Sequence, residues 1–173
     1  MAAPVSVHCP GTVQTSDREF ILTSDPGAAC LAYAAGNLSG NNDAINQMGY
    51  ITLDKSDDLW SGALPGSLVA TPPDSGLSGT FAFNVAGYTD LVIAFASGNG
   101  QLDPDWAAFS LPVGVTSGTW SITGAQDLSH VNLYGKPAPV PLPAAAWLLL
   151  SGLGMLGAVR RAVTGLGGAS SEL

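Results

Sequence analysis

The eight residues "DLVIAFAS", Asp90–Ser97, give the strongest structural signal in the chain. Successive side chains of a β-strand point to opposite faces of a sheet, and in this run apolar side chains fall on both faces. A strand of this kind is buried on both sides, which predicts the central strand of a β-sandwich. A second run, "GTFAFNV" (Gly79–Val85), alternates with a clear period of two and places Phe81, Phe83 and Val85 on one face.

Other short runs rich in β-formers lie on both sides of these two and are separated by Gly, Pro, Asn and Asp. They are Glu19–Thr23, Gly49–Lys55, Trp106–Pro112, Gly118–Ile122 and Leu128–Gly135. Strands at such regular spacing, with a turn signal between them, predict an all-β domain whose antiparallel sheets form a sandwich or jelly roll. The alanine-rich stretch "PGAACLAYAAG", Pro26–Gly36, is the best candidate for a helix of one or two turns.

The composition limits the classes of partner. The chain has 173 residues, a net charge of −8 and only five Lys and Arg, and two of those five are the neighbours Arg160 and Arg161. Because binding to nucleic acid requires Lys and Arg to neutralise phosphates, we expect no nucleic-acid partner. Charged residues make up 10% of the chain, so solubility depends on Ser, Thr, Asn and Gly. That surface is common in exported β proteins.

Two cysteines, Cys9 and Cys30, are present. In an oxidising compartment they would pair and stabilise the fold by about 3 kcal/mol in the chain-entropy model. The alternative is a pair of free, partly buried thiols. The cysteines lack the CxxC spacing of a structural zinc site, so we expect no zinc.

The C-terminal part contains an apolar run, Ala144–Val159, preceded by a proline-rich stretch and followed by Arg160 and Arg161. With its "VPLP" flank the run approaches the roughly 20 residues that span a bilayer. Trp147 suits a membrane interface, and the two arginines would remain on the cytoplasmic side. The alternative is a buried core helix of a soluble fold, which the length alone permits.

These signals predict four segments. They are a β-sandwich ectodomain (1–135), a proline-rich linker (136–143), a transmembrane helix that ends at the two arginines (144–161) and a flexible tail (162–173). No signal peptide is visible at the N-terminus, since "MAAPVSVHCP" has neither a basic nor an apolar region.

The C-terminal arrangement resembles the PEP-CTERM sorting signal of Gram-negative bacteria that make exopolysaccharide. It is most similar to the VPLPA variant, with a sorting motif of Val140, Pro141, Leu142 and Pro143. The commoner form has Glu at the position of Leu142. The stretch Gly87–Pro137 is also similar to an ectodomain that recurs just before such signals.

The resemblance implies a location and a processing enzyme. The helix would hold the chain transiently in the inner membrane, and an exosortase would read the motif that contains Pro141 and Pro143. Cleavage near the motif would release the ectodomain to the cell surface or the extracellular matrix. The resemblance therefore implies a structural or binding role in the exopolysaccharide layer. It implies no chemical reaction, because ectodomains of this kind are mostly of unknown activity.

The residues of the ectodomain point to binding more than to catalysis. His8 and His130 are the only histidines, neither lies in a catalytic motif, and His130 falls inside an expected strand. We therefore expect that the protein is not an enzyme and requires no cofactor. The least favoured alternative is a secreted hydrolase.

Two binding functions remain as alternatives. Asp103 and Asp105 lie in an oxygen-rich stretch that could hold calcium, although solvated turns have the same composition. A glycan could stack on one of the three tryptophans of the ectodomain, if that ring is exposed rather than part of the core. Those three residues are Trp60, Trp106 and Trp120.

Overall fold

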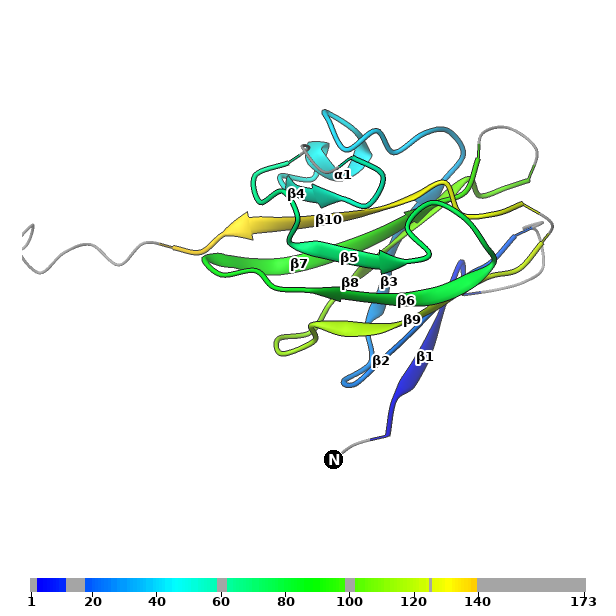
Figure 1. The fold of residues 1–173 in the computed structure, drawn as a ribbon, viewed down its shortest axis with the longest axis horizontal. Coiled ribbons are helices and arrows are strands. Elements are labelled where there is room, and N and C mark those ends of the chain that lie inside the picture. Colours follow the sequence, from blue (N-terminus) through cyan, green and yellow to red (C-terminus); the bar gives the residue numbers. More distant parts are fainter. Residues whose placement is uncertain (1–2, 12–17, 59–61, 99–101, 125, 140–173) are drawn as a thin grey trace, which may run out of the picture. The chain divides into compact units, whose positions relative to one another are not determined.

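Two antiparallel five-stranded sheets form the folded part of the chain (Figure 1). The computed structural model describes residues 3–11, 18–58, 62–98, 102–124 and 126–139. Sheet A has the strand order β1 (Val5–Cys9), β2 (Phe20–Ser24), β9 (Ser117–Ile122), β6 (Ser78–Phe83) and β5 (Leu68–Thr71). Sheet B has the order β3 (Ala29–Ala34), β8 (Trp106–Ser110), β7 (Tyr88–Ala96), β10 (His130–Pro137) and β4 (Ile51–Lys55). The all-β, sandwich-like class predicted from the sequence is confirmed.

Strand β7, which contains the "DLVIAFAS" run, is the middle strand of sheet B. It pairs with β8 on one side and with β10 on the other. Ile93 and Phe95 belong to the core that the two sheets share, whereas Val92 and Ala94 belong to a second cluster. Since the residues from Val92 to Ala96 are all buried, the prediction of a central strand buried on both faces is confirmed.

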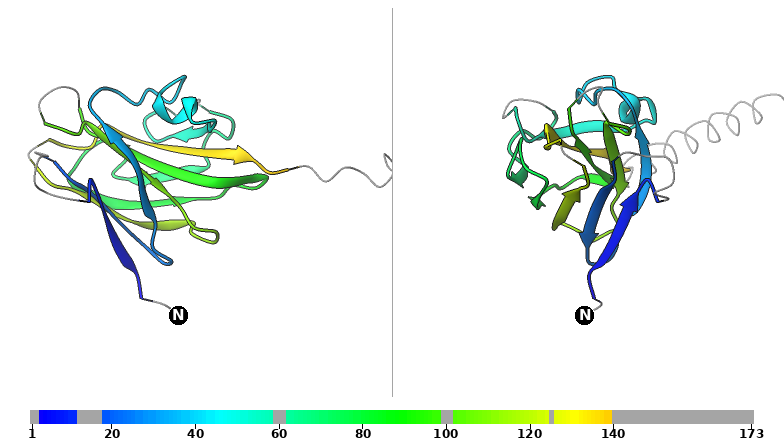
Figure 2. Two further views of the ribbon diagram at one scale, coloured as in Figure 1. Left: turned by 180° about the vertical axis from the view of Figure 1, so that it is seen from behind. Right: turned by 90° about the vertical axis from the view of Figure 1, so that its right-hand side faces the viewer.

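The core between the sheets centres on the ring of Phe95. This ring lies 6.2 Å from that of Phe81 and 5.7 Å from that of Trp120, both in sheet A, and 6.1 Å from that of Phe109 in sheet B. Centroid separations of this size are those of favourable aromatic pairs. The two sheets, whose arrangement Figure 2 shows from two further sides, are therefore held together by aromatic contacts in addition to aliphatic packing.

The other face of sheet B lies under the segment between β3 and β4, which contains the short helix α1 (Ala44–Gln47) (Figure 1). From this segment Leu38 and Ile45 pack with Val92 and Tyr134, and each of these four is at most 1% exposed. We call residues 35–50 the cover segment. It removes from water the apolar side chains that a two-layer sandwich would leave exposed on sheet B.

The prediction of a helix at Pro26–Gly36 is wrong, because this stretch contains the strand β3. Its backbone pairs with β8, and a disulfide joins Cys30 of β3 to Cys9 of β1. These long-range contacts outweigh the weak helical preference of its alanines. The disulfide joins an edge strand of sheet A to an edge strand of sheet B, over a sequence separation of 21 residues.

The folded domain extends slightly beyond residue 135, at which the sequence predicted its end. Lys136 pairs with Thr89 and Pro137 with Tyr88, so both residues belong to β10 rather than to a linker. The chain divides into the units Met1–Ala138 and Pro139–Leu173, and of the second unit only Pro139 is among the described residues. No helix in the described ranges is long and apolar enough to cross a membrane, and the segment 144–161 lies outside those ranges.

Replacing Phe95 by Ala tests the aromatic centre of the core. We expect the Phe95→Ala variant to lose about 3–5 kcal/mol of unfolding free energy, because a large buried side chain leaves a cavity between the sheets. Denaturant titration measures the loss. The control Val69→Ala, at a side chain that is 60% exposed, should lose less than about 1 kcal/mol. A Phe95→Ala loss as small as that of the control would contradict the described core.

Candidate functional site

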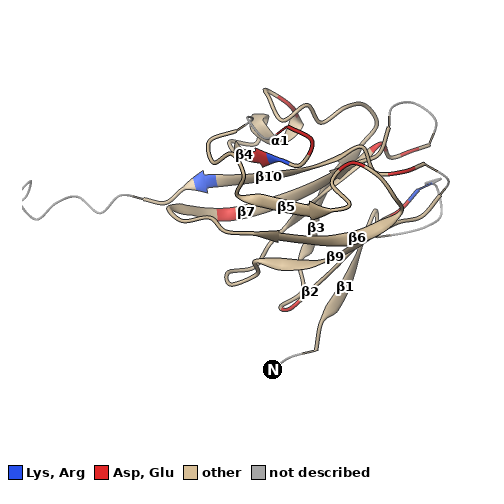
Figure 3. Ribbon diagram, in the orientation of Figure 1, with Lys and Arg blue, Asp and Glu red and all other residues tan. Residues whose placement is uncertain are grey.

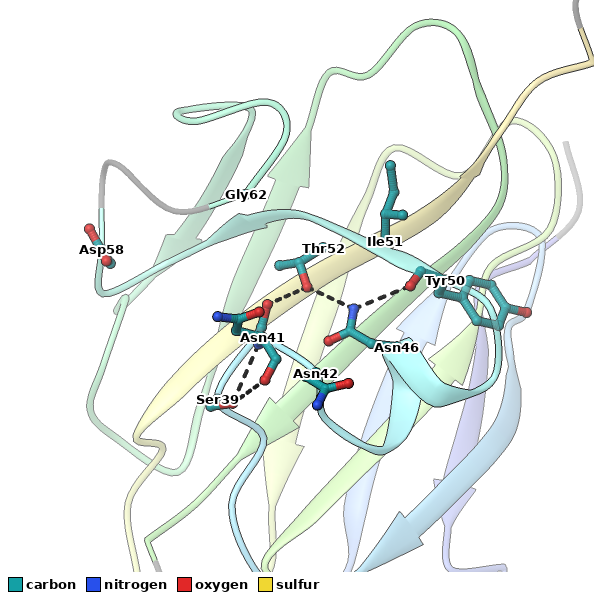
Figure 4. Close-up of a pocket in the computed structure, with 10 residues that line it drawn as sticks. Ser39, Asn41, Asn42, Asn46, Tyr50, Ile51, Thr52, Asp58 and Gly62 are labelled. Atoms are coloured by element: carbon teal, nitrogen blue, oxygen red, sulfur yellow. Dashed lines mark hydrogen bonds between the residues drawn. The ribbon is translucent and has the colours of Figure 1, made fainter.

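An open depression of about 750 Å³ lies where the cover segment meets β4 (Figure 4). Its polar lining is made of short amide, hydroxyl and carboxylate side chains. They are Ser39, Asn41, Asn42, Asn46, Thr52 and Asp58. Of these six, only Asp58 can carry a charge, so the depression offers mainly neutral hydrogen-bonding groups.

Asp43 organises the loop that forms one wall of the depression. Its Oδ1 accepts from the backbone N–H of Ile45 (3.0 Å) and of Asn46 (3.1 Å), and its Oδ2 accepts from the N–H of Gly40 (2.9 Å). The side chain of Asn46 in turn accepts from the N–H of Asp43 at 3.1 Å, which completes a capping box. The carboxylate thus satisfies backbone donors at the start of the helix α1 and in the turn before it.

Asn46 and Thr52 connect this loop to β4. The Asn46 Nδ2 donates to the carbonyl of Tyr50 at 3.2 Å and to the Thr52 hydroxyl at 3.1 Å. The Thr52 hydroxyl donates to the carbonyl of Gly40 at 2.5 Å. These bonds, drawn in Figure 4, fix both walls of the depression relative to each other.

Polar side chains of β10 support the loop from below. The buried hydroxyl of Tyr134 donates to the Asp43 Oδ2 at 2.7 Å, and the Asn132 Nδ2 donates to the Leu38 carbonyl (3.0 Å) and to the Tyr134 hydroxyl (2.9 Å). The His130 Nε2 lies 2.6 Å from the same Leu38 carbonyl and therefore carries the proton that it donates. Three side chains of one strand thus hold the cover segment in place.

Burial sets the protonation state of two of these side chains. It raises the pKa of Tyr134, and the hydrogen bond to Asp43 raises it further, so the phenol stays a neutral donor. Burial also lowers the pKa of His130, and this effect exceeds the opposing effect of the Leu38 hydrogen bond. Lys55 lowers the His130 pKa further, whereas Asp57 and Asp43 raise it. The imidazole is therefore neutral at pH 7.

The two predicted glycan-stacking tryptophans within the described ranges are part of the core. Trp106 is 4% exposed and packs on the face of sheet B under the cover segment, and Trp120 is 3% exposed between the sheets. Neither ring offers a face to a sugar, because both complete the packing of apolar neighbours. The third candidate, Trp60, lies outside the described residues.

The predicted calcium ligands Asp103 and Asp105 differ in their burial. Asp103 is exposed, whereas Asp105 is buried and its Oδ2 accepts from the N–H of Gly36 at 2.6 Å. Burial lowers the pKa of Arg18, and the negative charge of Asp105 raises it by a smaller amount. In the described ranges no group of three or more His, Cys, Asp or Glu side chains is placed to hold a metal ion.

Arg18 was not singled out by the sequence analysis, although it is only 1% exposed. It donates to the carbonyl of Ser97 at 2.5 Å and to the side chain of Gln126. A lone arginine just before a strand, in an otherwise acidic domain, was the available signal. The depression also had a signal, since "DAIN" (Asp43–Asn46) is a capping-box pattern that the sequence analysis did not use.

A second cavity, of about 420 Å³, lies where the connection between β6 and β7 meets the connection between β8 and β9. Phe83, Leu111 and Val115 are buried residues of its lining, which is mainly apolar. Because it brings few polar groups together, it offers less chemical selectivity than the depression does.

The fold and the depression together define the class of this molecule: an all-β, sandwich-like domain with an open, mainly neutral polar site. In comparisons with known proteins, no family model, no curated protein and no solved structure matches the chain. The predicted sorting motif, Val140–Pro143, and the arginines Arg160 and Arg161 lie outside the described residues.

Removing the Asp43 carboxylate tests the organisation of the depression. We expect Asp43→Ala to lower the unfolding free energy by about 2–4 kcal/mol, since a helix cap is lost and the buried Tyr134 hydroxyl loses its acceptor. Thermal or denaturant unfolding measures the change. Asp74→Ala, at an exposed carboxylate, is the control and should remain within about 0.5 kcal/mol of the wild type. Equal stability of the two variants would contradict the role of Asp43.

His130 makes the stability depend on pH. Its pKa is lower in the folded state than the 6.5 of a free histidine, so below pH 6.5 the unfolded chain takes up a proton that the folded chain does not. The stabilisation is complete above pH 6.5 and is lost as the pH falls from there toward the folded pKa. We expect urea titrations between about pH 7.5 and 5.5 to show a smaller decrease in His130→Gln than in the wild type.

The control for this experiment is Val69→Ala, at a side chain that is 60% exposed and carries no ionisable group. We expect this variant to keep the wild-type dependence on pH. An unchanged dependence in His130→Gln would rule out a neutral, buried His130.

Proposed function

We propose that the chain is an exported surface or extracellular-matrix protein of an exopolysaccharide-producing Gram-negative bacterium, held transiently in the inner membrane and processed by an exosortase. One observation carries this proposal. A proline-rich motif (Val140–Pro143), an apolar run (Ala144–Val159) and the pair Arg160–Arg161 follow each other in the order of a PEP-CTERM sorting signal.

The physical properties of the three parts agree with this order. Proline fixes the backbone in an extended form, which keeps the motif accessible to an enzyme. The apolar run with its flank has about the length that a bilayer requires. Arginines at one end keep that end in the cytoplasm, so the domain at the other end would lie across the inner membrane.

The folded domain supports export by its chemistry. Its sheets are joined by the disulfide between Cys9 and Cys30, a bond that persists in oxidising compartments outside the cytoplasm. Its low content of charged residues suits a surface that is solubilised by Ser, Thr, Asn and Gly.

We assign the domain a structural or binding role in the extracellular layer, with no catalytic reaction. The described lining of the depression supports binding, because it consists mainly of amides and hydroxyls, which form hydrogen bonds, and contains neither a histidine nor a cysteine. Calcium binding is one alternative, although the described residues form no cluster of three or more carboxylate, histidine or cysteine ligands. Hydrolysis is the least favoured alternative.

Processing at the motif is tested in a Gram-negative host that contains an exosortase. We expect mass spectrometry of the released protein to show loss of the residues that follow Pro141 or its close neighbours. The double variant Pro141→Ala/Pro143→Ala should accumulate uncleaved in the membrane fraction. Pro139→Ala, outside the motif, is the control and should be processed normally. Release of the intact chain, or normal processing of the double variant, would contradict the proposal.

A further inference from the structure

We infer that the depression between the cover segment and β4 binds a neutral carbohydrate. Sugars present dense hydroxyl groups, each able to donate and accept, and amide and hydroxyl side chains form both kinds of bond with them. The lining of the depression consists mainly of these groups. The inference deepens the proposed function, on which it rests for its biological setting, by naming the class of ligand that the exported domain holds.

Charge around the depression disfavours an anionic ligand. Among the described residues that line the depression there is no Lys or Arg, and the one ionisable carboxylate is that of Asp58. The lysines of β4 and β10 (Figure 3) have carboxylate partners, since the Lys55 Nζ lies 3.2 Å from Asp57 and the Lys136 Nζ lies 3.5 Å from Asp90. Within the described residues, a phosphate or a uronic acid would therefore meet a carboxylate and neither of these lysines without a partner.

Asn41 and Asn42 provide the groups that a ligand can reach. Both are exposed, and within the described ranges neither side-chain amide has a hydrogen-bond partner. Asn42 has a left-handed backbone with φ 52°, which Asn tolerates better than most residues. In Figure 4 the ring of Tyr50 points away from these asparagines. The sugar is therefore held by hydrogen bonds and not by stacking on this ring.

The loop that carries the two asparagines is fixed before a ligand arrives. The Asp43 carboxylate accepts four hydrogen bonds, three from the loop backbone and one from the buried Tyr134. Little conformational entropy is then lost when a ligand binds, so a few hydrogen bonds suffice for a measurable affinity.

The size and openness of the depression fit an oligosaccharide. Its volume of about 750 Å³ lies in the usual range for small-molecule sites. Because it is open to solvent, a chain longer than the depression can extend beyond it on both sides. A polymer of neutral sugars can therefore pass over the site while a few units contact Asn41 and Asn42.

The test is a binding titration with the full chain in a zwitterionic detergent, because detergents with sugar head groups would compete. The probes are maltohexaose, cellohexaose and a mannan oligomer as neutral ligands, oligogalacturonate as the acidic one, and calcium chloride alone. We expect at least one neutral probe to bind with a dissociation constant at or below the millimolar range. We expect oligogalacturonate and calcium to bind more weakly.

Paired variants locate the site. Asn41→Ala/Asn42→Gly should weaken neutral-sugar binding at least about tenfold and leave the melting temperature nearly unchanged, because both side chains are exposed and unbonded and glycine adopts the left-handed backbone of residue 42 without strain. Asn84→Ala, at an exposed asparagine on another loop, is the matched control and should retain the wild-type affinity.

Three results would overturn the inference: no binding of any neutral probe at about 10 mM, a preference for oligogalacturonate or calcium, or equal binding by the double variant and the wild type. Export and cleavage are measured separately in cells. A chain that is processed but binds no neutral sugar refutes this inference alone, and a chain that binds but is never processed refutes the proposed function alone.

Discussion

Burial of both faces of β7 is the constraint on which the rest of this structure depends. One face packs against sheet A around Phe95, and the other would expose Val92 and Ala94 if the sandwich had two layers only. The cover segment removes that exposure. It is a loop with a single short helix, however, so most of its backbone donors and acceptors require partners outside regular secondary structure.

Polar side chains of β10 and the carboxylate of Asp43 supply those partners. His130, Asn132 and Tyr134 lie on the strand next to β7 and direct hydrogen bonds at Leu38 and Asp43 of the cover segment. A buried polar network of this kind stabilises one arrangement when it is satisfied and is unfavourable when it is broken. The same bonds that close the core therefore also give the depression above it a fixed shape.

Much of the fold follows from local pattern. Short runs rich in β-formers predicted β6, β7 and five further strands, which are β2, β4, β8, β9 and β10. Residues 29–34 were predicted as helix, since their alanines carry a weak local preference that pairing with β8 overrides. The first and fifth strands, β1 and β5, were missed, because short edge strands with exposed side chains give little signal.

The site was harder to foresee than the fold. The hydrogen bond between Tyr134 and Asp43 joins residues that are 91 positions apart, so no local sequence pattern predicts it. Trp106 and Trp120 were candidates for stacking on a sugar because their rings are aromatic. Both are buried, because large rings in the strands of a small sandwich fill its core. The proposed sorting motif, by contrast, is a pattern of adjacent residues, so its prediction from the sequence requires no knowledge of the fold.

The central claim is that the cover segment is a layer of the fold and not a mobile loop. Native-state hydrogen exchange of the backbone amides of Gly40, Ile45 and Asn46 tests it most directly, because these three amides donate to Asp43. The account predicts protection within about tenfold of that in β10, with both regions opening together. Exchange at the rate of an unstructured chain, while β10 stays protected, would contradict it.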